Sequence, residues 1–487
     1  MSAKVRAILL MSIVIVTIGC GGGSGRAPGN NTGGSSNPSG PPNAGSVSIT
    51  PNGDTLRVGG QRQFSGWDSS VGQYDVIWSL EEGAAAGTIT TDGFYTAPGT
   101  PGIFHLIATS SHNSSLSATV TVTVVSIGFA VVSEMGTART GHTATLLADG
   151  KVLVAGGTSD VAHTAELFVP GSSSFASAGA MIHVRTGHCA SLLPDGRVLI
   201  AGGVDGSGTL ITTAEIFDPG TQTFADTADL NQPRRAASCT PLASGKVLIA
   251  GGHDSGDGFV LTAELYDATT GRFQVAGKML SPRAHHAAIR LGNGTVLLVA
   301  GDSEGSSAEL FDPATGTFSA TGSLTEARAH ASATLLANGK VLILGGTQVM
   351  PPVGGGASPA PVSIDSAEIY DPAIGLFQST GKLLNARDSH SATLLSDGTV
   401  LVAGGYIHGF DGDADPEWDT IISAEVFNPE TLASTRAASL EVDRAEHVAT
   451  LLSDGHVLIT GGIQGFLELC CRPKPQTQSL TSAEVFK

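Results

Sequence analysis

Apolar and polar residues alternate most clearly in residues 387–405, RDSHSATLLSDGTVLVAGG. SHSATLL has the period of two that is typical of a half-buried strand, and TVLVA is a β-branched run that ends on Gly404-Gly405. Asp397-Gly398 stands between the two runs. Asp-Gly favours the left-handed backbone of a tight hairpin turn, so this stretch is predicted to be two antiparallel strands.

The same pattern recurs along most of the chain. Each copy begins with an arginine, at Arg139, Arg185, Arg234, Arg283, Arg328, Arg387 and Arg444. A glycine follows eleven residues later in every copy, at Gly150, Gly196, Gly245, Gly294, Gly339, Gly398 and Gly455. Self-similarity with a period of roughly 45–60 residues is typical of propellers and solenoids.

Two further signals complete each unit and predict a third and a fourth strand. The third strand carries a glutamate, at Glu166, Glu215, Glu264, Glu309, Glu368, Glu425 and Glu484. The fourth carries an aromatic residue ten positions before the arginine, at Phe129, Phe175, Phe224, Phe273, Phe318 and Phe377, with Ser434 in the seventh place.

Four short strands per unit, with a doubled glycine after the second, resemble the kelch repeat and the propeller of the galactose-oxidase type. One unit departs from the pattern with Gly301-Asp302, and phenylalanine replaces the tryptophan usual in the fourth strand. The resemblance implies an all-β fold with a seven-bladed β-propeller over residues 126–487. The chain ends on a third strand, SAEVF (482–486), while GFAVVSEM (128–135) is a fourth strand with nothing before it. We therefore expect the N-terminal strand to complete the last blade, which leaves no free edge.

The N-terminal residues predict export. Lys4 and Arg6 precede a short apolar run, and Gly19-Cys20 ends it. Residues 1–19 resemble a bacterial lipoprotein signal peptide, which implies lipidation of Cys20; an ordinary cleaved signal peptide is the alternative. Residues 20–45 are rich in Gly, Ser and Pro and form a flexible tether. Residues 46–125 contain short alternating runs, and GTITTDGFYTAP resembles bacterial Ig-like domains, which implies a β-sandwich spacer.

The net charge changes the list of partners. It is −18, and no basic cluster occurs beyond the N-terminus. This balance disfavours nucleic acid as a partner and leaves a lipid anchor as the expected contact with a membrane. We expect the protein at the bacterial cell envelope, at the outer membrane or cell surface.

Repeated polar residues are interpreted as structural. Arginine and glutamate occur in all seven units, and buried charges need partners, so they predict an ion pair in each blade. A histidine follows the arginine by three positions in five units, with Ala237 and Ala331 in the other two. We interpret these histidines as packing or hydrogen-bonding residues rather than metal ligands.

Loop length varies at one place only, between the glycine pair and the glutamate. The three longest loops, 347–365, 406–422 and 463–480, belong to consecutive units and lie on one face, which predicts a binding face. Aromatic and charged residues concentrate in the last two loops. The candidate ligand-binding residues are Tyr406, His408, Phe410, Asp411, Asp413, Asp415, Trp418, Phe466 and Arg472.

No cofactor is expected. Asp411, Asp413 and Asp415 have the spacing of calcium ligands, but Pro416 stands where such loops need glycine; a solvated acidic loop is the alternative. Cys189 and Cys239 are interpreted as buried thiols, and Cys470-Cys471 as a pair that export would permit to oxidise, with the pairing left open.

The function predicted is binding or adhesion to a glycan or a protein. Galactose oxidase holds copper with two tyrosines and two histidines. Of the five tyrosines here, Tyr74, Tyr95, Tyr266, Tyr370 and Tyr406, only Tyr406 is expected on the binding face, and no Tyr-His dipeptide occurs. No catalytic residue is assigned. An exported carbohydrate-active enzyme, an oxidase or an epimerase, is the alternative, carried by fold-level analogy alone.

Overall fold

The computed structural model describes residues 45–125, 128–157, 163–256, 258–302, 305–350, 360–410, 416–466 and 476–487. The fold is all-β, and two short 3-10 helices, η1 (Gly83–Ala86) and η2 (Pro170–Ser172), are its helical elements in these ranges. No helix in them is both long enough and apolar enough to cross a membrane. The predicted signal peptide, the lipidation site Cys20 and most of the tether lie outside the described residues.

The first part of the chain is a small β domain with its own core. A four-stranded sheet has the order β2 (Asp54–Arg57), β9 (Ser117–Val125), β8 (Gly102–Ser110), β5 (Val76–Leu80). A three-stranded sheet has the order β3 (Gln61–Gln63), β7 (Phe94–Thr96), β6 (Thr88–Ile89), and β1 (Val47–Thr50) pairs with β4 (Ser65–Asp68). Phe64, Tyr95 and Leu106 are fully buried, and Trp78 packs against this core as expected.

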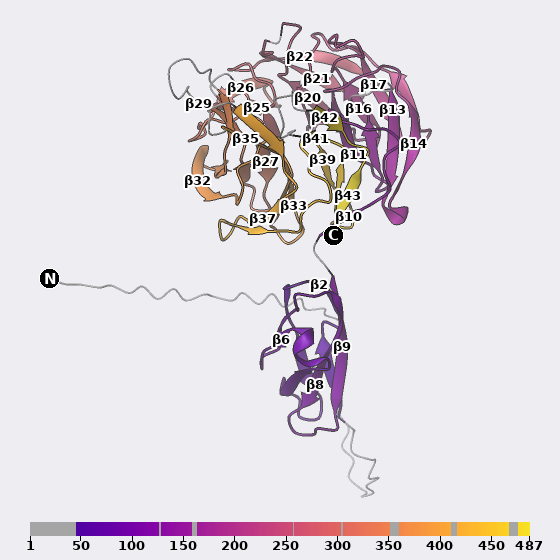
Figure 1. The fold of residues 1–487 in the computed structure, drawn as a ribbon, viewed down its shortest axis with the longest axis vertical. Coiled ribbons are helices and arrows are strands. Elements are labelled where there is room, and N and C mark those ends of the chain that lie inside the picture. Colours follow the sequence, from indigo (N-terminus) through magenta and orange to yellow (C-terminus); the bar gives the residue numbers. More distant parts are fainter. Residues whose placement is uncertain are drawn as a thin grey trace, which may run out of the picture.

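Seven four-stranded antiparallel sheets occupy the described residues from 129 to 486 (Figure 1). From inner to outer strand, the first three are β11 (Thr143–Leu146), β12 (Val152–Ala155), β13 (Thr164–Val169), β14 (Ser174–Ala180); β15 (Cys189–Leu192), β16 (Val198–Ala201), β17 (Ala214–Asp218), β18 (Thr223–Asp226); and β19 (Ser238–Pro241), β20 (Lys246–Ala250), β21 (Thr262–Asp267), β22 (Arg272–Lys278). The fourth and fifth are β23 (Ala287–Arg290), β24 (Val296–Val299), β25 (Ala308–Asp312), β26 (Thr317–Ala320); and β27 (Ser332–Leu335), β28 (Val341–Leu344), β31 (Ser366–Asp371), β32 (Leu376–Lys382). The sixth and seventh are β33 (Ser391–Leu394), β34 (Val400–Ala403), β37 (Ala424–Asn428), β38 (Ala433–Arg436); and β39 (Val448–Leu451), β40 (Val457–Thr460), β43 (Ala483–Phe486), β10 (Phe129–Val131).

The sheets close into a ring. The first strand of each sheet contacts the first strand of the next, and β39 contacts β11. The second strands, such as VLVA in β12, are buried along their whole length because their side chains fill the space between neighbouring sheets. As expected, the N-terminal strand completes the seventh sheet: β10 pairs with β43, with Phe129 opposite Phe486 (Figure 1).

The seven arginines and seven glutamates form the predicted pairs. The Nη2 group of Arg328 donates a hydrogen bond to Glu368 Oε1 at 2.9 Å, and both side chains are buried. In the other six pairs the distance between arginine Nη2 and glutamate Oε1 is 2.7–2.9 Å. Arg328 Nη1 also donates to the carbonyls of Gly345 and Ser366, while Glu368 Oε2 accepts the N–H of Thr325. Each pair therefore ties three backbone segments together, which requires the planar, multiple-donor guanidinium rather than a lysine.

The repeated histidines join neighbouring sheets. In each of the five units that have one, Nε2 bonds a hydroxyl of the preceding sheet at 2.8–2.9 Å, from Thr143, Ser238, Ser332, Ser391 or Thr460. Thr460 shows how specific this contact is. The seventh sheet has Val448 at the position that carries the hydroxyl in the other four sheets, and Thr460, directly opposite Val448 on the next strand, supplies it to His142. The interpretation of these residues as hydrogen-bonding groups is confirmed.

The two interfaces without this histidine are built differently, and one corrects an expectation. Where Ala237 replaces the histidine, Cys189 of the second sheet forms a disulfide with Cys239 of the third, so the two cysteines are not buried thiols. Their Cα atoms are 5.6 Å apart because neighbouring first strands run side by side. Where Ala331 replaces it, an apolar cluster that includes Ala287, Ala300 and Ala331 fills the interface.

The glycine pair of the fourth unit was placed one residue too late by the sequence pattern. Each arginine donates to the carbonyl seventeen residues later, and for Arg283 this is Ala300. Ala300 has φ +63°, within the range of +55° to +68° of the first glycine in the other units, so the pair is Ala300-Gly301 rather than Gly301-Asp302. In five units, a Cβ on the first glycine would contact the next unit's histidine. Ala331 gives Ala300 the room that those histidines occupy.

Ser434 interrupts a row of aromatic pairs in the outer strands. Every other sheet pairs two aromatic rings there with centroids 4.8–5.1 Å apart. In the sixth sheet Phe427 faces Ser434, whose buried Oγ has no hydrogen-bond partner among the described residues. Ser434→Phe should therefore raise the free energy of unfolding by about 1 kcal/mol, measured by thermal and urea unfolding. An unchanged or lower melting temperature would contradict this expectation.

Candidate functional site

The three long loops form hairpins that stand side by side. They are β29 (Thr347–Met350) with β30 (Ala360–Ser363), β35 (Tyr406–Phe410) with β36 (Pro416–Thr420), and β41 (Ile463–Phe466) with β42 (Gln476–Ser479). β30 contacts β35, and β36 contacts β41, so the hairpins form one wall on one face of the ring. Their adjacency was predicted from their positions in consecutive units.

Three of the predicted binding residues pack within this wall. Trp418 lies against Gly465 of the next hairpin, where a Cβ would come within 2.6 Å of the indole. The rings of Tyr406 and Trp418 meet edge to face at 5.3 Å, and those of Tyr406 and His408 at 5.6 Å. All three side chains are half-buried, so Trp418 holds two hairpins together and leaves a partial surface for a ligand.

Several predicted residues cannot be placed. Asp411, Asp413, Asp415 and Arg472 lie outside the described residues, as do Cys470 and Cys471. The backbone of Phe410 ends β35 and that of Phe466 ends β41.

A ring of left-handed residues lies at the inner edge of the same face. It consists of the second residue after each arginine: Gly141, Gly187, Ala236, His285, His330, Ser389 and Glu446, all with φ between +49° and +63°. Backbone hydrogen bonds connect these residues from unit to unit, for example Glu446 N–H to Ser389 O at 3.1 Å. We call the space that they surround the mouth. Five non-glycine residues in this conformation cost roughly 1–3 kcal/mol each, a strain that is concentrated at functional sites.

Three of the seven ring residues, His285, His330 and Glu446, have ionisable side chains. His285 and His330 stack with centroids 4.5 Å apart, and His253 follows at 5.4 Å from His285. His285 and His330 are both exposed to solvent. Desolvation, reinforced for His285 by the other imidazoles, holds the pKa of both below its usual value, which favours the neutral imidazole at pH 7.

The two units that follow His330 around the ring carry carboxylates, which interact electrostatically with His330. Glu446 is exposed and accepts weak hydrogen bonds from Thr140 Oγ1 at 3.3 Å and Tyr406 Oη at 3.5 Å. Burial and the charge of Glu446 raise the pKa of Tyr406, which therefore acts as a donor. Asp388 is buried beneath His408, with Oδ2 at 2.7 Å from Nδ1.

The sequence interpretation missed most of the mouth. The residue directly after the arginine varies between units and is alanine in three of them and Asp388 in another. The second residue after the arginine varies from glycine to His285, His330 and Glu446. Variation at a repeated position on the binding face was the signal available.

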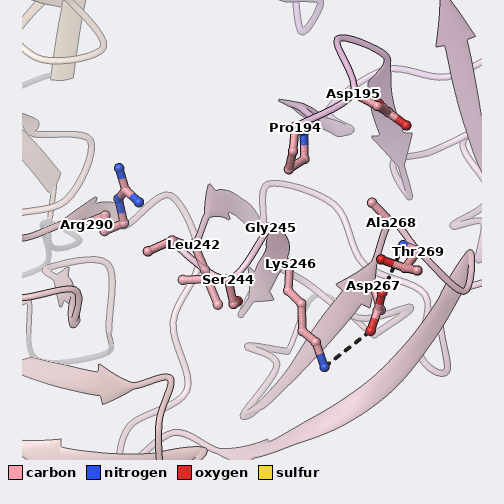
Figure 2. A pocket seen from close by; sticks show the side chains of 11 residues that line it. Pro194, Asp195, Leu242, Ser244, Gly245, Lys246, Asp267, Ala268, Thr269 and Arg290 are labelled. Carbon is pink, nitrogen blue, oxygen red and sulfur yellow. Dashed lines mark hydrogen bonds and ion pairs between the residues drawn. The ribbon is translucent and has the colours of Figure 1, made fainter.

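Two kinds of hollow accompany the ring. One, of about 520 Å³, lies at the rim of the mouth between the second and third units and is lined by Arg235, Asp254 and Thr209 among others. Another, of about 640 Å³, lies on the opposite face among the hairpin turns. Figure 2 shows its lining, in which Lys246 bonds Asp267 at 3.4 Å and Arg290 stands apart. Exposed turn residues surround it.

Metal-ligand geometry is absent from the described part of the mouth. Among the described residues, three ligand atoms come together at Glu81, Glu82 and His105 of the N-terminal domain, and not among the imidazoles and carboxylates of the mouth. Tyr266 and Tyr370 lie on third strands and hydrogen-bond Thr227 and Thr321, which follow the fourth strand of the preceding sheet and not the inner strand. Tyr406 is therefore the one tyrosine that the described residues bring to the mouth, and the mouth does not reproduce a two-tyrosine, two-histidine copper site.

Comparison with known proteins agrees with the repeat pattern. Residues 185–231 match the Kelch motif. This stretch is one unit of the array, from Arg185 into the turn before Arg234. No curated protein matches the chain by sequence.

Two solved structures were compared with the chain. A fungal alcohol oxidase of the AA5 family, in complex with copper, is 18% identical with a TM-score of 0.56; the match covers 74% of this chain and 76% of the oxidase. The structure of YjhT is 12% identical with a TM-score of 0.47, covering 63% of this chain and 99% of YjhT. At 18% identity the similarity to the oxidase shows a shared fold and no activity, and the repeat that matches the Kelch motif agrees with a kelch-type propeller.

Proposed function

We propose that the chain is an exported, lipid-anchored protein of the bacterial cell envelope that binds a glycan or a protein. In this proposal, the ring is a seven-bladed kelch-type propeller that serves as the binding head, and residues 46–125 are an Ig-like spacer. The observation that carries the proposal is the meeting of the strained ring, His285, His330, Ser389 and Glu446, with the hairpin residues Tyr406 and His408 on one face. The Cys189–Cys239 disulfide supports export, because disulfides persist in oxidising compartments.

The anchor is tested by changing the residue to be lipidated. Cys20→Ser should move the protein from the membrane fraction to the soluble fraction, because a thioether-linked lipid cannot form on serine. Fractionation followed by immunoblotting measures this, and metabolic labelling with a fatty acid should disappear with the same change. A variant that fractionates and labels as wild type does would refute the anchor.

Binding at the mouth is tested on a glycan array with the full chain in detergent. His285→Ala with His330→Ala, and separately Trp418→Ala, should weaken binding to retained glycans about tenfold or more, because they remove hydrogen bonds and ring contacts. Lys151→Ala is the control, since Lys151 pairs with Asp149 on the turn face. Equal affinity of wild type and mouth variants would show that the binding site lies elsewhere. Turnover of a retained sugar would show that the protein is an enzyme rather than a binding protein.

A further inference from the structure

The carboxylate of Asp388 is held by three donors. Oδ2 accepts the hydroxyl of Ser363 at 2.6 Å and Nδ1–H of His408 at 2.7 Å, and Oδ1 accepts the hydroxyl of Ser389 at 3.0 Å. Its side chain is 2% exposed. Burial alone would raise the pKa of Asp388, but these hydrogen bonds outweigh it and the pKa is lowered. Asp388 is therefore an ionised acceptor.

An ionised Asp388 determines the tautomer of His408. A carboxylate only accepts, so the proton of a neutral His408 resides on Nδ1 and its Nε2 carries a lone pair. The backbone N–H of His408 also donates to Ser363 Oγ at 2.9 Å, and its ring lies against Tyr406. His408 keeps 21% of its side-chain surface exposed, and no described residue forms a hydrogen bond with Nε2.

The groups around this nitrogen select the chemistry of a ligand. His408 Nε2 and the exposed Glu446 both need donors, while the neutral imidazoles of His285 and His330 each offer one donor and one acceptor. A hydroxyl donates and accepts at once and suits both kinds of group. An ammonium group only donates and cannot accept a hydrogen bond from either imidazole, whereas a carboxylate only accepts and would be repelled by Glu446 and Asp388.

We propose that His408 accepts a hydrogen bond from a ligand hydroxyl through Nε2, that Asp388 positions its ring, and that the ligand is an uncharged saccharide. This inference rests on the proposed binding function. His408 is the residue that touches the ligand, and Asp388, with Ser363, acts through it.

The tautomer is tested by NMR of the full chain labelled with ¹⁵N-histidine at pH 7.5. The signal lost in His408→Gln identifies the residue and should show protonated Nδ1 and unprotonated Nε2. Asp388→Asn should abolish this preference, and Ser363→Ala, a milder change, should weaken it if Asp388→Asn does not fold. A wild-type His408 protonated on Nε2 overturns the proposal.

Ligand chemistry is tested on an array of neutral hexose and N-acetylhexosamine oligosaccharides together with uronate- and sialate-containing ones. We expect retention of neutral glycans only, at least tenfold weaker binding in His408→Ala, and weaker binding in Asp388→Asn together with its altered tautomer. His456→Ala is the matched control, because His456 makes the same Nδ1 contact with Asp454 at 3.0 Å on the turn face. Retained neutral glycans that bind His408→Ala as tightly as wild type overturn this inference and leave the binding function intact. Retention of acidic glycans alone, or of no glycan at all, overturns the ligand class of this inference, and the second result leaves a protein as the ligand of the proposed binding function.

Discussion

Acidification from pH 6 to pH 4 should destabilise the ring steeply, by up to about 7 kcal/mol per pH unit if it unfolds as one unit. Burial, with a neighbouring arginine, lowers the pKa of His142, His286 and His390 to about 3 and that of His188 and His447 well below the usual value. The unfolded chain binds a proton at each of these positions near pH 6.5 and the folded chain does not. Since the unfolded state then holds more protons, stability rises with pH in this window and is lost as pH falls.

The measurement is urea unfolding at a series of pH values, with proton uptake followed by calorimetry in buffers of different ionisation enthalpy. Each histidine contributes about 1.4 kcal/mol per pH unit. His390→Gln can keep a hydrogen bond to Ser332. It should lower the slope of unfolding free energy against pH by about 1.4 kcal/mol per pH unit, which corresponds to one proton fewer taken up on unfolding. A slope near zero between pH 6 and pH 5 would contradict neutral buried imidazoles. Carboxylates with lowered pKa, such as Asp388, add to the same trend at the acid end.

Removing one member of a buried Arg–Glu pair should be the most damaging single change in the ring. Glu264→Gln leaves the guanidinium of Arg234 buried without its counter-charge, which should cost roughly 3–5 kcal/mol of unfolding free energy. Lys151→Ala, which breaks the exposed pair with Asp149, should cost less than about 1 kcal/mol under the same conditions.

A double variant distinguishes the contribution of the two opposite charges from that of the hydrogen bonds between the arginine and backbone carbonyls. Arg234→Met with Glu264→Met removes both charges, yet leaves the carbonyl of Gly251 without its donor, while the carbonyl of Thr262 keeps the N–H of Gly251 at 3.4 Å. It should therefore remain destabilised by about 1–3 kcal/mol for each carbonyl left unpaired. Recovery of wild-type stability in the double variant would show that only the charges matter.

Sequence periodicity was sufficient for the architecture, and local contacts explain where it failed. Repeats at fixed spacing revealed the four strands, the closing partner of β10 and the Arg–Glu pairs, because each unit must solve the same packing problem. The shift at Ala300 and the Cys189–Cys239 bond were missed because both depend on what the neighbouring sheet lacks, a histidine at Ala331 or Ala237. Such compensation is visible only when two units are compared across an interface.

The candidate site was found in part. Length variation identified the hairpins with Tyr406, His408 and Trp418, but aromatic content suggested exposed platforms where the structure has packing between hairpins. Asp388 and the ring through Glu446 belong to short connections of constant length, so loop length could not reveal them. Their convergence arises from seven-fold repetition around one axis, which no local pattern contains.

The closure of the ring by β10 also determines how the head would carry a mechanical load. β10 enters the ring at the turn face, where Lys487 N–H bonds Gly128 O at 3.0 Å, and it runs antiparallel to β43 toward the face of the mouth. A pull between the proposed N-terminal tether and a proposed ligand in the mouth would therefore act along β10. Its hydrogen bonds with β43 lie across that direction and share the force together instead of opening one after another. The strand that closes the ring is thus loaded in shear, the geometry in which a short strand resists force best.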